Sequence, residues 1–442
     1  MTGEKGYDTI LGEKDSIMKE KVVRLGLFGL GTVGGGIVEL LSRKKGEKDR
    51  HKLILEKIVV KHPEKERFVP VPSHLLTTNP KEILANPRID TVVEVMGGIN
   101  PAKEIILEAL KSGKNVVTAN KAVLARAGSE IFKQALKNNC YLGVRASNIA
   151  TYRLIESLIS SPFQFEKLVG IFNGTCNYIL TEMEKKGEDF SPILKKAQEI
   201  GYAEQNPSDD IDGCDTAHKL IVLLGLALGY FPLLDSLFVE GIRGISHQDI
   251  VFAKELGYRI KLLAIAKRED DVLEARVHPA LLPRERGLAR LDGIGNGVEL
   301  RDEVGVEIGM QAPGAGKYPT ATAILEDLVS VARGRKLIYP QVERYLTLKK
   351  MGEIMSKYYL RFNAFDEAGV LAKISGILGN HNISIKSVLQ KAENKKPPGV
   401  VPVIMLTHQA REEDIQSALG KIDNLRVVKG KSLLIRVEQG IF

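Results

Sequence analysis

The chain has 442 residues, of which 44% are hydrophobic and 27% are charged, and its net charge is +8. This length exceeds one ordinary hydrophobic core, so we expect two or three domains of a globular protein rather than a disordered chain. The apolar runs are too short for a membrane-spanning helix and the charged start is unlike a signal peptide, so we expect a cytoplasmic protein with no membrane partner. Basic residues are interspersed with acidic ones, which argues against nucleic acid as a partner and fits a phosphate-bearing cofactor better.

The first third of the chain alternates strand and helix patterns. Residues 1–20 are polar with little periodicity, and we expect them to form a mobile extension. The apolar runs that predict strands lie at residues 22–28, 53–60, 91–96, 115–118 and 141–144. Helical patterns such as residues 102–110 separate these runs, and this alternation predicts a parallel sheet covered by helices. We therefore expect residues 21–148 to form an α/β domain.

Two further domains are predicted after this sheet. Residues 149–337 combine long helical patterns with strand-like runs, which indicates an α+β domain, and residues 338–356 are expected to form a linker. Residues 357–442 follow the order strand, helix, strand, strand, helix, strand, which predicts a ferredoxin-like domain. Its elements are expected at residues 358–365, 370–378, 383–390, 400–406, 412–421 and 425–437.

A glycine motif follows the first predicted strand. Gly29, Gly31 and Gly34 form GxGxxG at the start of a helix, and we assign Thr32 and Val33 to the same turn. Glycines there permit a tight turn and let a pyrophosphate approach the backbone amides. The same motif also occurs where a helix merely packs on a sheet, but its position at the start of an α/β pattern favours dinucleotide binding.

The end of the second strand bears on the choice of cofactor. An NAD site usually has an acidic residue there, whereas this chain has Lys61, followed by Lys65 and Arg67. Basic residues at this point can contact a 2'-phosphate, so the sequence favours NADP. A solvated basic loop is an alternative explanation, and NAD remains open.

Polar residues follow two more of the predicted strands. Gly97 comes after one strand, and Asn120 and Lys121 come after the next. Ligands of open parallel sheets bind outside the carboxyl ends of the strands, and Asn120 can cap the helix that begins at Lys121. We therefore expect all three residues at the cofactor cleft, with Lys121 as a candidate catalytic residue.

The densest chemical cluster spans residues 201–219. It holds several carboxylates and runs into an apolar helix, in which Asp215 and Lys219 lie one turn apart. Buried carboxylates need a cationic partner, such as a lysine or a substrate ammonium group. Hydride transfer from an alcohol needs a group that takes the hydroxyl proton, and a lysine can do so. A surface ion pair is the alternative, and we expect His218 to point to another side of the helix.

Seven segments together resemble the homoserine dehydrogenase family along residues 21–442. They are GLFGLGTVGGG, VVEVMGG, NVVTANKAVLA, GIFNGTCNYIL, GYAEQNPSDDIDGCDTAHK, ELGYRIKLLAIAK and PGAGKYPTATAILEDL. The resemblance implies reversible interconversion of homoserine and aspartate 4-semialdehyde in threonine, methionine and isoleucine biosynthesis. It implies an N-terminal Rossmann dinucleotide-binding domain, an α+β catalytic and dimerisation domain, and a homodimer or homotetramer. No aspartokinase-like segment precedes the first strand, so we expect the monofunctional form.

The resemblance also implies roles for individual residues. Lys219 and Lys121 match the two lysines of the reaction centre, and Lys219 is expected to be the proton shuttle. The substrate is expected to contact Glu204, Asp210, Asp215, Gly174 and Thr175.

One segment departs from the family pattern. The family has Glu-Ala-Ser-Val, a glycine pair and Ile-Pro in a stretch that helps bind a monovalent cation, whereas residues 141–151 here include Arg145-Ala-Ser-Asn148 without the glutamate, the paired glycines or the proline. The cation requirement therefore remains open. A catalytically impaired paralogue that senses an amino acid or nucleotide is the alternative function.

Residues 357–442 resemble an ACT domain, a ferredoxin-like module that binds amino acids. Asp366, Gly369 and Asn382 lie in the matching segments. The resemblance implies feedback by an amino acid such as threonine at these residues. A dimerisation module that binds nothing is the alternative.

Overall fold

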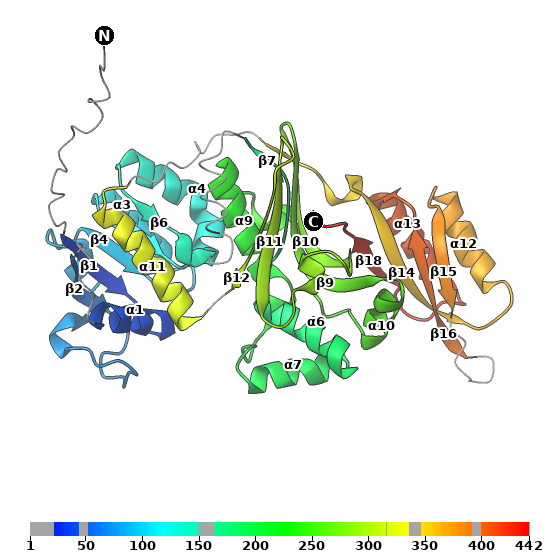
Figure 1. The fold of residues 1–442 in the computed structure, drawn as a ribbon, viewed down its shortest axis with the longest axis horizontal. Helices are drawn as coiled ribbons and strands as arrows, with labels where there is room; N and C mark the ends of the chain where they lie inside the picture. The colour runs from blue at the N-terminus through cyan, green and yellow to red at the C-terminus, as the bar shows by residue number, and fades with distance from the viewer. Residues whose placement is uncertain are drawn as a thin grey trace, which may run out of the picture.

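The computed structural model describes residues 22–43, 52–148, 152, 163–314, 316–335, 346–390 and 399–441. The extension expected at residues 1–20 and the first part of the expected linker lie outside them. An N-terminal unit, which we name the nucleotide-binding unit for the prediction made from its glycine motif at residues 29–34, a central domain and a C-terminal domain follow one another along the long axis of the molecule (Figure 1). Within the described residues, no helix is long and apolar enough to cross a membrane.

The nucleotide-binding unit contains a parallel six-stranded sheet in the order β3-β2-β1-β4-β5-β6. Its strands are β1 (Val22–Phe28), β2 (Lys52–Val59), β3 (Leu76–Thr77), β4 (Thr91–Glu94), β5 (Asn115–Thr118) and β6 (Leu142–Gly143). Its first helices are α1 (Thr32–Ser42), α2 (Lys81–Leu84), α3 (Ala102–Lys111) and α4 (Lys121–Lys137). Phe28 pairs with Glu94 and Glu94 with Thr118, so the carboxyl ends of β1, β4 and β5 meet at one edge. The predicted α/β class is confirmed.

The central domain is built on long antiparallel strands. They are β7 (Phe165–Ile171), β9 (Tyr258–Glu269), β10 (Val272–Pro283), β11 (Gly295–Asp302) and β12 (Glu307–Pro313), with the short β8 (Phe238–Val239) beside β10. The helices are α6 (Gly174–Lys186), α7 (Phe190–Glu199), α8 (Ser208–Ile211), α9 (Cys214–Leu228) and α10 (His247–Glu255). Helix α9 packs beside α4, which brings the cluster predicted around Asp215 to the strand ends of the first sheet.

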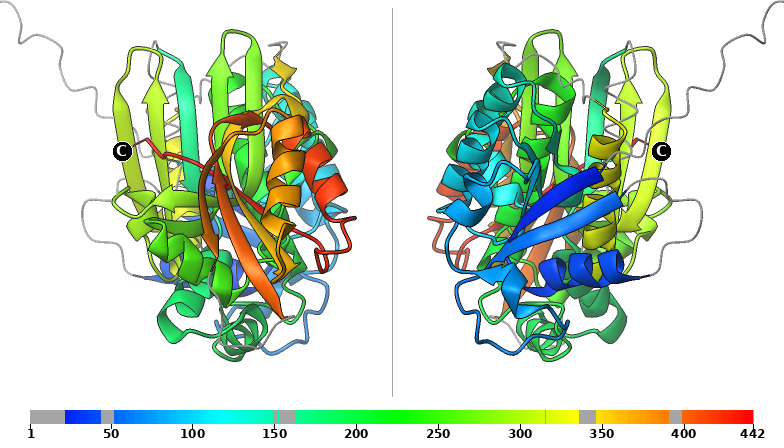
Figure 2. Two further views of the ribbon diagram at one scale, coloured as in Figure 1. Left: turned by 90° about the vertical axis from the view of Figure 1, so that its right-hand side faces the viewer. Right: turned by 90° about the vertical axis from the view of Figure 1, so that its left-hand side faces the viewer.

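Helix α11 (Lys317–Ala332) returns to the nucleotide-binding unit although it follows β12 in the chain. It packs beside α1 (Figure 2, right). Its first residue, Lys317, forms an ion pair with Glu39 at 2.7 Å. Apolar residues of α11, such as Ile324 and Leu328, share a core with β1. The predicted range 149–337 therefore does not form one spatial unit, because the apolar face of α11 is buried against the first domain.

The C-terminal domain has the predicted ferredoxin-like order. Its elements are β14 (Met355–Phe365), α12 (Val370–Asn380), β15 (Ile385–Gln390), β16 (Val400–Thr407), β17 (Ala410–Arg411), α13 (Glu412–Ile422) and β18 (Leu433–Val437). Both long helices cover one face of the sheet β18-β14-β16-β15 (Figure 2, left). Strand β18 also pairs with β10, so the sheets of the central and C-terminal domains are continuous. The short β13 (Thr347–Leu348) lies on the other end of β10.

One predicted strand of this domain was too long. We expected a strand over residues 425–437, but β18 begins only at Leu433. Leu425 and Val428 belong to turns, whose backbone bonds run from Leu425 N to Ile422 O and from Val428 N to Leu425 O. Val428 forms only an isolated β-bridge with Ala364. The side chains of Leu425 and Val428 pack in the core of this domain, so their apolar pattern reflects packing more than a continuous strand. Single 3₁₀ turns lie at Ser73–Leu75, Arg145–Ser147, Leu234–Ser236, Leu288–Arg290 and Met351–Glu353.

Candidate active site

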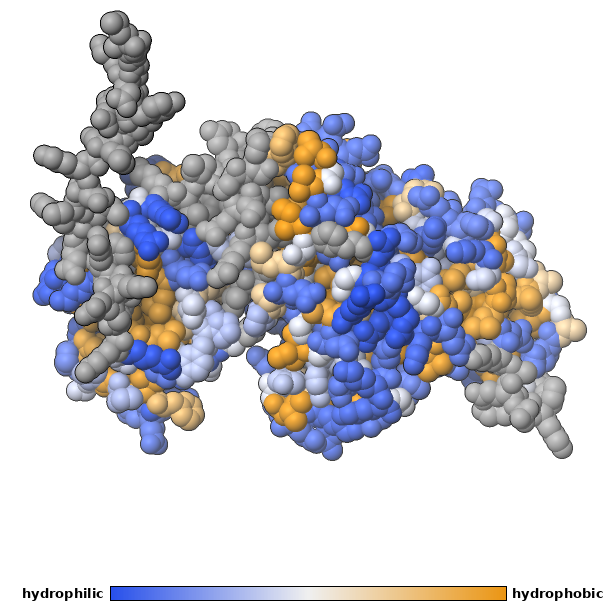
Figure 3. Space-filling view, in the orientation of Figure 1, coloured by the Kyte–Doolittle hydropathy of each residue, from blue (hydrophilic) through white to orange (hydrophobic). Residues whose placement is uncertain are grey.

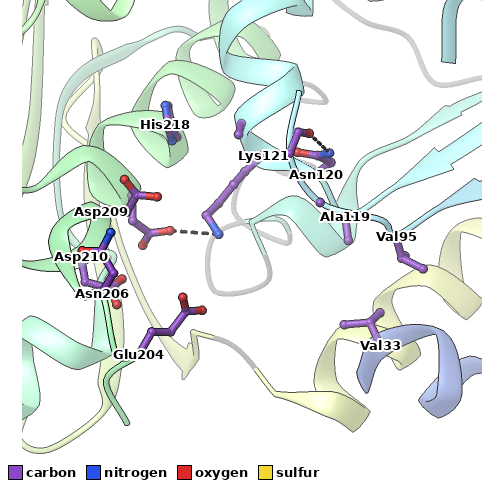
Figure 4. Close-up of a pocket in the computed structure, with 14 residues that line it drawn as sticks. Val33, Val95, Ala119, Asn120, Lys121, Glu204, Asn206, Asp209, Asp210 and His218 are labelled. Carbon is purple, nitrogen blue, oxygen red and sulfur yellow. Dashed lines mark hydrogen bonds and ion pairs between the residues drawn. The ribbon is translucent and has the colours of Figure 1, made fainter. Parts of the chain in front are cut away.

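A cavity of about 360 Å³ lies where the edge of the first sheet faces α8 and α9. The nucleotide-binding unit contributes Val33, Val95, Gly97, Gly98, Ala119, Asn120, Lys121 and Ala122. The central domain contributes Glu204, Asn206, Asp209, Asp210, Asp215 and His218. Lys121 extends from the start of α4 towards the acidic side (Figure 4). The cavity therefore joins a glycine-rich cofactor edge to a carboxylate cluster, as the sequence predicted.

The glycine turn after β1 fits a dinucleotide. Gly29 has a φ of +102°, and a Cβ on Gly34 would lie 2.3 Å from the carbonyl oxygen of Gly29, so both positions require glycine. A Cβ on Gly31 would meet nothing within 4 Å, which leaves open space at the N-terminal end of α1. Backbone amides at the start of a helix favour a phosphate group in such a space.

A second cavity, of about 560 Å³, lies on the other side of the same turn. It is lined by Leu30, Gly31, Thr32, Gly35, Lys65, Glu66, Arg67, Phe68, Val69 and Lys317. The predicted Gly31 and Thr32 thus face this cavity, whereas the predicted Lys61 lines neither of the two cavities described here. Lys61 is exposed just beyond β2, and the chain turns so that Lys65 and Arg67 approach the glycine turn instead.

Lys121 is held in place by its neighbours at the ends of β4 and β5. The buried Glu94 accepts hydrogen bonds from Thr118 Oγ1 at 2.6 Å and from the Met96 amide at 2.8 Å. Asn120 donates to the carbonyl oxygen of Gly98 at 2.7 Å, and its own Oδ1 accepts from the Val123 amide at 3.2 Å. Asn120 therefore caps α4, as predicted, and directs Lys121 into the cavity.

Asp215 links the two candidate lysines. Its Oδ1 lies 3.0 Å from Lys121 Nζ, and its Oδ2 lies 2.9 Å from Lys219 Nζ. Burial alone raises the pKa of Asp215, but the charges of Lys219 and Lys121 outweigh burial and hold this pKa well below its usual value. Burial lowers the pKa of Lys121, but the charge and hydrogen bond of Asp215 raise it more, so the net pKa of Lys121 is raised. Asp215 is therefore a carboxylate, and Lys121 carries a proton at neutral pH.

Lys219 lies deeper than Lys121. Its Nζ also donates to the carbonyl oxygen of Phe172 at 2.6 Å, and Asn296 Nδ2 donates to the same oxygen at 2.9 Å. The side chain of Lys219 is 11% exposed, against 38% for Lys121. Lys219 is therefore behind Asp215, whereas Lys121 lines the cavity directly.

Asn173 joins Asp210 and Asp215, two carboxylates that the sequence predicted to bind the substrate, and we did not assign its side chain a role from the sequence. Its Nδ2 donates to Asp210 Oδ1 at 2.6 Å and to Asp215 Oδ2 at 2.9 Å, while its Oδ1 accepts from the Cys176 amide at 2.8 Å. Burial raises the pKa of Asp210, which indicates that a cationic ligand would stabilise its ionised form. The sequence did show Asn173-Gly174 at the start of a predicted helix, which is typical of a helix cap. That pattern does not indicate the contacts of Asn173 with residues 210 and 215.

Other predicted residues divide into two groups. Glu204 lines the cavity, but Gly174 and Thr175 are not among its lining residues. Thr175 Oγ1 donates to the carbonyl oxygen of Tyr202 at 2.8 Å, which ties the start of α6 to the chain that carries Glu204.

His218 lines the cavity, contrary to our expectation, because residues 215 and 218 lie on the same side at the start of α9. Burial lowers the pKa of His218.

The three predicted effector residues do not meet within one chain. Gly369 precedes the first residue of α12, and Asn382 follows its last turn. A helix of 11 residues is about 16 Å long, so the two ends of α12 cannot contact the same small ligand. Asp366 lies at the Gly369 end, where its Oδ1 accepts from Gln390 Nε2 at 3.2 Å.

Comparison with known proteins agrees with the fold described above. Residues 152–329 match the family described as "Homoserine dehydrogenase", residues 29–145 match "Homoserine dehydrogenase, NAD binding domain", and residues 358–426 match "ACT domain". A homoserine dehydrogenase of Neisseria gonorrhoeae is 37% identical over 433 residues, and one of Bacillus subtilis is 35% identical over 432 residues. Each alignment covers 95% of this chain and 99% of the relative. The crystal structure of a homoserine dehydrogenase from Thiobacillus denitrificans is similar with a TM-score of 0.85 and 37% identity, over 95% of this chain and 99% of that chain.

Proposed function

The chain belongs to the homoserine dehydrogenase family, and we propose that it reduces L-aspartate 4-semialdehyde to L-homoserine reversibly with a nicotinamide cofactor. The observation that carries this proposal is the Lys121–Asp215–Lys219 cluster at the strand ends beside the glycine turn. The alternative of an impaired sensor is not favoured, because both lysines and the carboxylate between them are present and in contact.

The proposed roles of the two lysines follow from proton balance. The residues of the glycine turn would hold the nicotinamide cofactor, which when bound would supply a hydride to the carbonyl carbon in the reducing direction. The carbonyl oxygen must gain a proton at the same time, and a lysine ammonium group within hydrogen-bond reach can donate it. Lys219 is assigned as the proton shuttle, because Asp215 and the Phe172 carbonyl oxygen accept from its Nζ and leave one N–H bond for the substrate. Lys121, whose pKa is raised, would hold a positive charge beside the same oxygen.

The carboxylates of the cavity are assigned to the amino group of the substrate. Glu204 and Asp210 line the cavity opposite Lys121, and an ammonium group between them would offset the cost of burying Asp210. The positions of Gly174 and Thr175 support an indirect role, in which the first turn of α6 holds the segment that carries Glu204 in place.

NADP is the proposed cofactor, with NAD as the alternative. Lys65 and Arg67 line the cavity beside the glycine turn, where a 2'-phosphate would gain from two positive charges. Lys61, which we predicted for this role, is exposed and remains a weaker candidate.

Regulation by an amino acid such as threonine, in a homodimer or homotetramer, is also proposed. The separation of Gly369 from Asn382 supports a site completed by a second chain, because no single ligand reaches both ends of α12. Leu371 and Val388 of the C-terminal domain are 42% and 43% exposed in the single chain. Figure 3 shows apolar surface over this domain.

The deciding experiment is an initial-rate assay of the purified protein. Aspartate 4-semialdehyde reduction and homoserine oxidation are measured with NADP and NAD cofactors separately, with and without threonine. Robust turnover with homoserine supports the proposal, and a higher kcat/KM with the NADP pair supports the cofactor assignment. Absence of turnover while cofactor still binds in calorimetry would overturn it in favour of the sensor.

A further inference from the structure

Arg145 is buried where the chain departs from the family pattern. It begins the 3₁₀ turn Arg145–Ser147 after β6, and only 6% of the residue is exposed. In this turn the residues Arg145-Ala146-Ser147 stand where the family has Glu-Ala-Ser beside a monovalent cation. The chain therefore has a fixed positive side chain in place of a carboxylate.

The Arg145 side chain is held by α11. Its Nη1 forms an ion pair with Asp327 Oδ1 and donates to Ser330 Oγ at 3.2 Å, and its backbone amide donates to Asp327 Oδ2 at 3.0 Å. Tyr141 donates its hydroxyl to Asp327 Oδ1 at 2.8 Å. The guanidinium carbon lies 4.5 Å from the ring centre of Tyr152. The fully buried Asp327 thus accepts hydrogen bonds from the Arg145 guanidinium group, the Arg145 backbone amide and the Tyr141 hydroxyl group.

The described part of this segment, residues 141–148 and 152, does not fit a monovalent cation. Such an ion needs several oxygen atoms with free lone pairs around one centre, whereas a guanidinium group has only donors and carries the same charge as the ion. The oxygens of Asp327 are already engaged, and Asp327 packs so closely on Gly143 that a Cβ there would lie 2.6 Å from its carboxyl carbon. Nor is there, among the described residues, any group of three or more His, Cys, Asp or Glu that could hold a metal ion.

The same turn reaches the helix that carries Lys219. Asn148, three residues after Arg145, donates from Nδ2 to the carbonyl oxygen of Lys219 at 3.2 Å. Residues 145–148 therefore connect α11, which packs on the cofactor-binding unit, with α9 of the central domain. A change in the position of this turn would move Lys219 relative to the glycine turn.

We propose that Arg145 is a permanent internal cation that replaces the exchangeable monovalent cation of the family, and that it positions residues 145–148 against α9. The proposal rests on the proposed dehydrogenase function for its kinetic consequence. If Arg145 replaces the exchangeable ion, turnover is independent of sodium and potassium, and Arg145 is a positioning residue rather than a catalytic one.

The first test compares salts with the wild-type protein. Rates are measured in sodium chloride, potassium chloride and tetramethylammonium chloride at equal ionic strength, and the melting temperature is measured in the same solutions. We expect no specific response to sodium or potassium in either measurement, because an ion that binds the folded state would raise the melting temperature. A saturable rise in rate of about fivefold or more with sodium or potassium would overturn the proposal. About fivefold is the lower limit of the effect that one bound ligand typically has on a second, coupled site. A protein with no turnover in any salt contradicts the proposed function instead, and the melting measurement still tests the cation site.

The second test uses Arg145→Ala and Arg145→Lys. We expect Arg145→Ala to lose kcat and to regain part of it when guanidinium ion is added at millimolar concentration, with no such effect on the wild type. Arg145→Lys, which keeps the charge, is expected to retain more activity than Arg145→Ala. Arg243→Ala is the matched control, because Arg243 forms an exposed ion pair with Asp212. Wild-type kcat in Arg145→Ala would overturn the positioning role, and if Arg145→Ala does not fold, Arg145→Lys and the salt comparison decide.

Discussion

Lys121 on α4 and Asp215 on α9 are 3.0 Å apart across the boundary between the nucleotide-binding unit and the central domain. The second oxygen of Asp215 holds Lys219, so one carboxylate sets the positions of two amino groups from two parts of the chain. Its burial makes this contact strong, because charges out of water interact with less screening. We therefore expect the proposed reaction centre to be sensitive to any change at Asp215.

Replacing Asp215 with Asn should remove most of the activity. The amide keeps the shape of the side chain but loses the charge that holds both lysines, so we expect kcat to fall on the order of 100-fold or more, as when a preorganised charged group is lost. Cofactor affinity should change little, because the polar contacts described for Asp215 go to Lys121, Lys219 and Asn173 and not to the glycine turn. Steady-state kinetics and a fluorescence titration with the cofactor measure the two effects. Asp212→Asn is the control, since Asp212 pairs with Arg243 at the surface, and equal kcat losses in the two variants would contradict the prediction.

Replacing Lys219 with Ala should abolish turnover while leaving cofactor binding intact. Loss of a general acid typically lowers the rate by about 100- to 10,000-fold. Single-turnover reduction with pre-bound cofactor separates this step from substrate binding. Lys186→Ala is a suitable control because Lys186 pairs only with Glu182 of its own helix among the pairs described. A Lys219→Ala protein with unchanged kcat would remove Lys219 as the proton shuttle.

Local patterns predicted the part of the site that depends on nearby residues. Asp215 and Lys219 are one helical turn apart, and Lys121 follows a strand end, so local spacing predicted each of these positions. The meeting of the two lysines in one centre was implied by the family resemblance and not by spacing. The contacts of Asn173 with residue 215 and of Arg145 with Asp327 span 42 and 182 residues, respectively, and no periodicity encodes them. The return of α11 to the first domain was missed for the same reason, because its helical pattern does not say which sheet its apolar face covers.

We expect Lys65 to determine the preference of the protein for NADPH over NADH. A hydrogen bond to a charged group contributes about 1.5–3 kcal/mol, so Lys65→Ala should raise KM for NADPH by about tenfold or more and leave KM for NADH nearly unchanged. Lys61→Ala is the matched comparison and should have a smaller effect, since Lys61 does not line the cavity of Lys65. The ratio of kcat/KM for the two cofactors is the measurement. If Lys61→Ala lowers this ratio more than Lys65→Ala does, the role belongs to Lys61 as the sequence first indicated.

The stability of the protein should rise between pH 7 and pH 9 because of Lys261. This lysine of β9 is 1% exposed, and its Nζ donates to Asn177 Oδ1 at 2.7 Å and to the Leu291 carbonyl oxygen at 2.6 Å. Burial lowers its pKa in the folded protein from 10.5 to about 7, with Arg259 adding to the effect. The unfolded chain therefore binds more protons than the folded chain above pH 7, and the free energy of unfolding rises with pH in that window.

The expected rise from this group is about 2 kcal/mol between pH 7 and pH 9. Urea denaturation of the wild type and of Lys261→Met at pH 7, 8 and 9 isolates it, because all other titrating groups are shared. Methionine has a similar length and cannot titrate, so its curve should rise less with pH. Parallel pH dependences of the two proteins would show that Lys261 keeps an ordinary pKa.

Replacing Gly369 with Asp should remove inhibition by the amino-acid effector without lowering the uninhibited rate. Gly369 has a φ of +86° and a Cβ there would meet nothing within 4 Å, so the side chain has room and the cost is backbone strain of about 1–3 kcal/mol. The added carboxylate would occupy the approach to the first turn of α12 and repel the carboxylate of an amino acid. Gly430→Asp is a close control, because Gly430 lies in the same domain with a φ of +77° and equally open space. Inhibition curves with threonine and with the other common amino acids compare the variants. If Gly369→Asp is inhibited to the same degree as the wild type, the effector binds elsewhere. If Gly430→Asp also loses inhibition, the loss reflects strain in the domain and not occupation of the site.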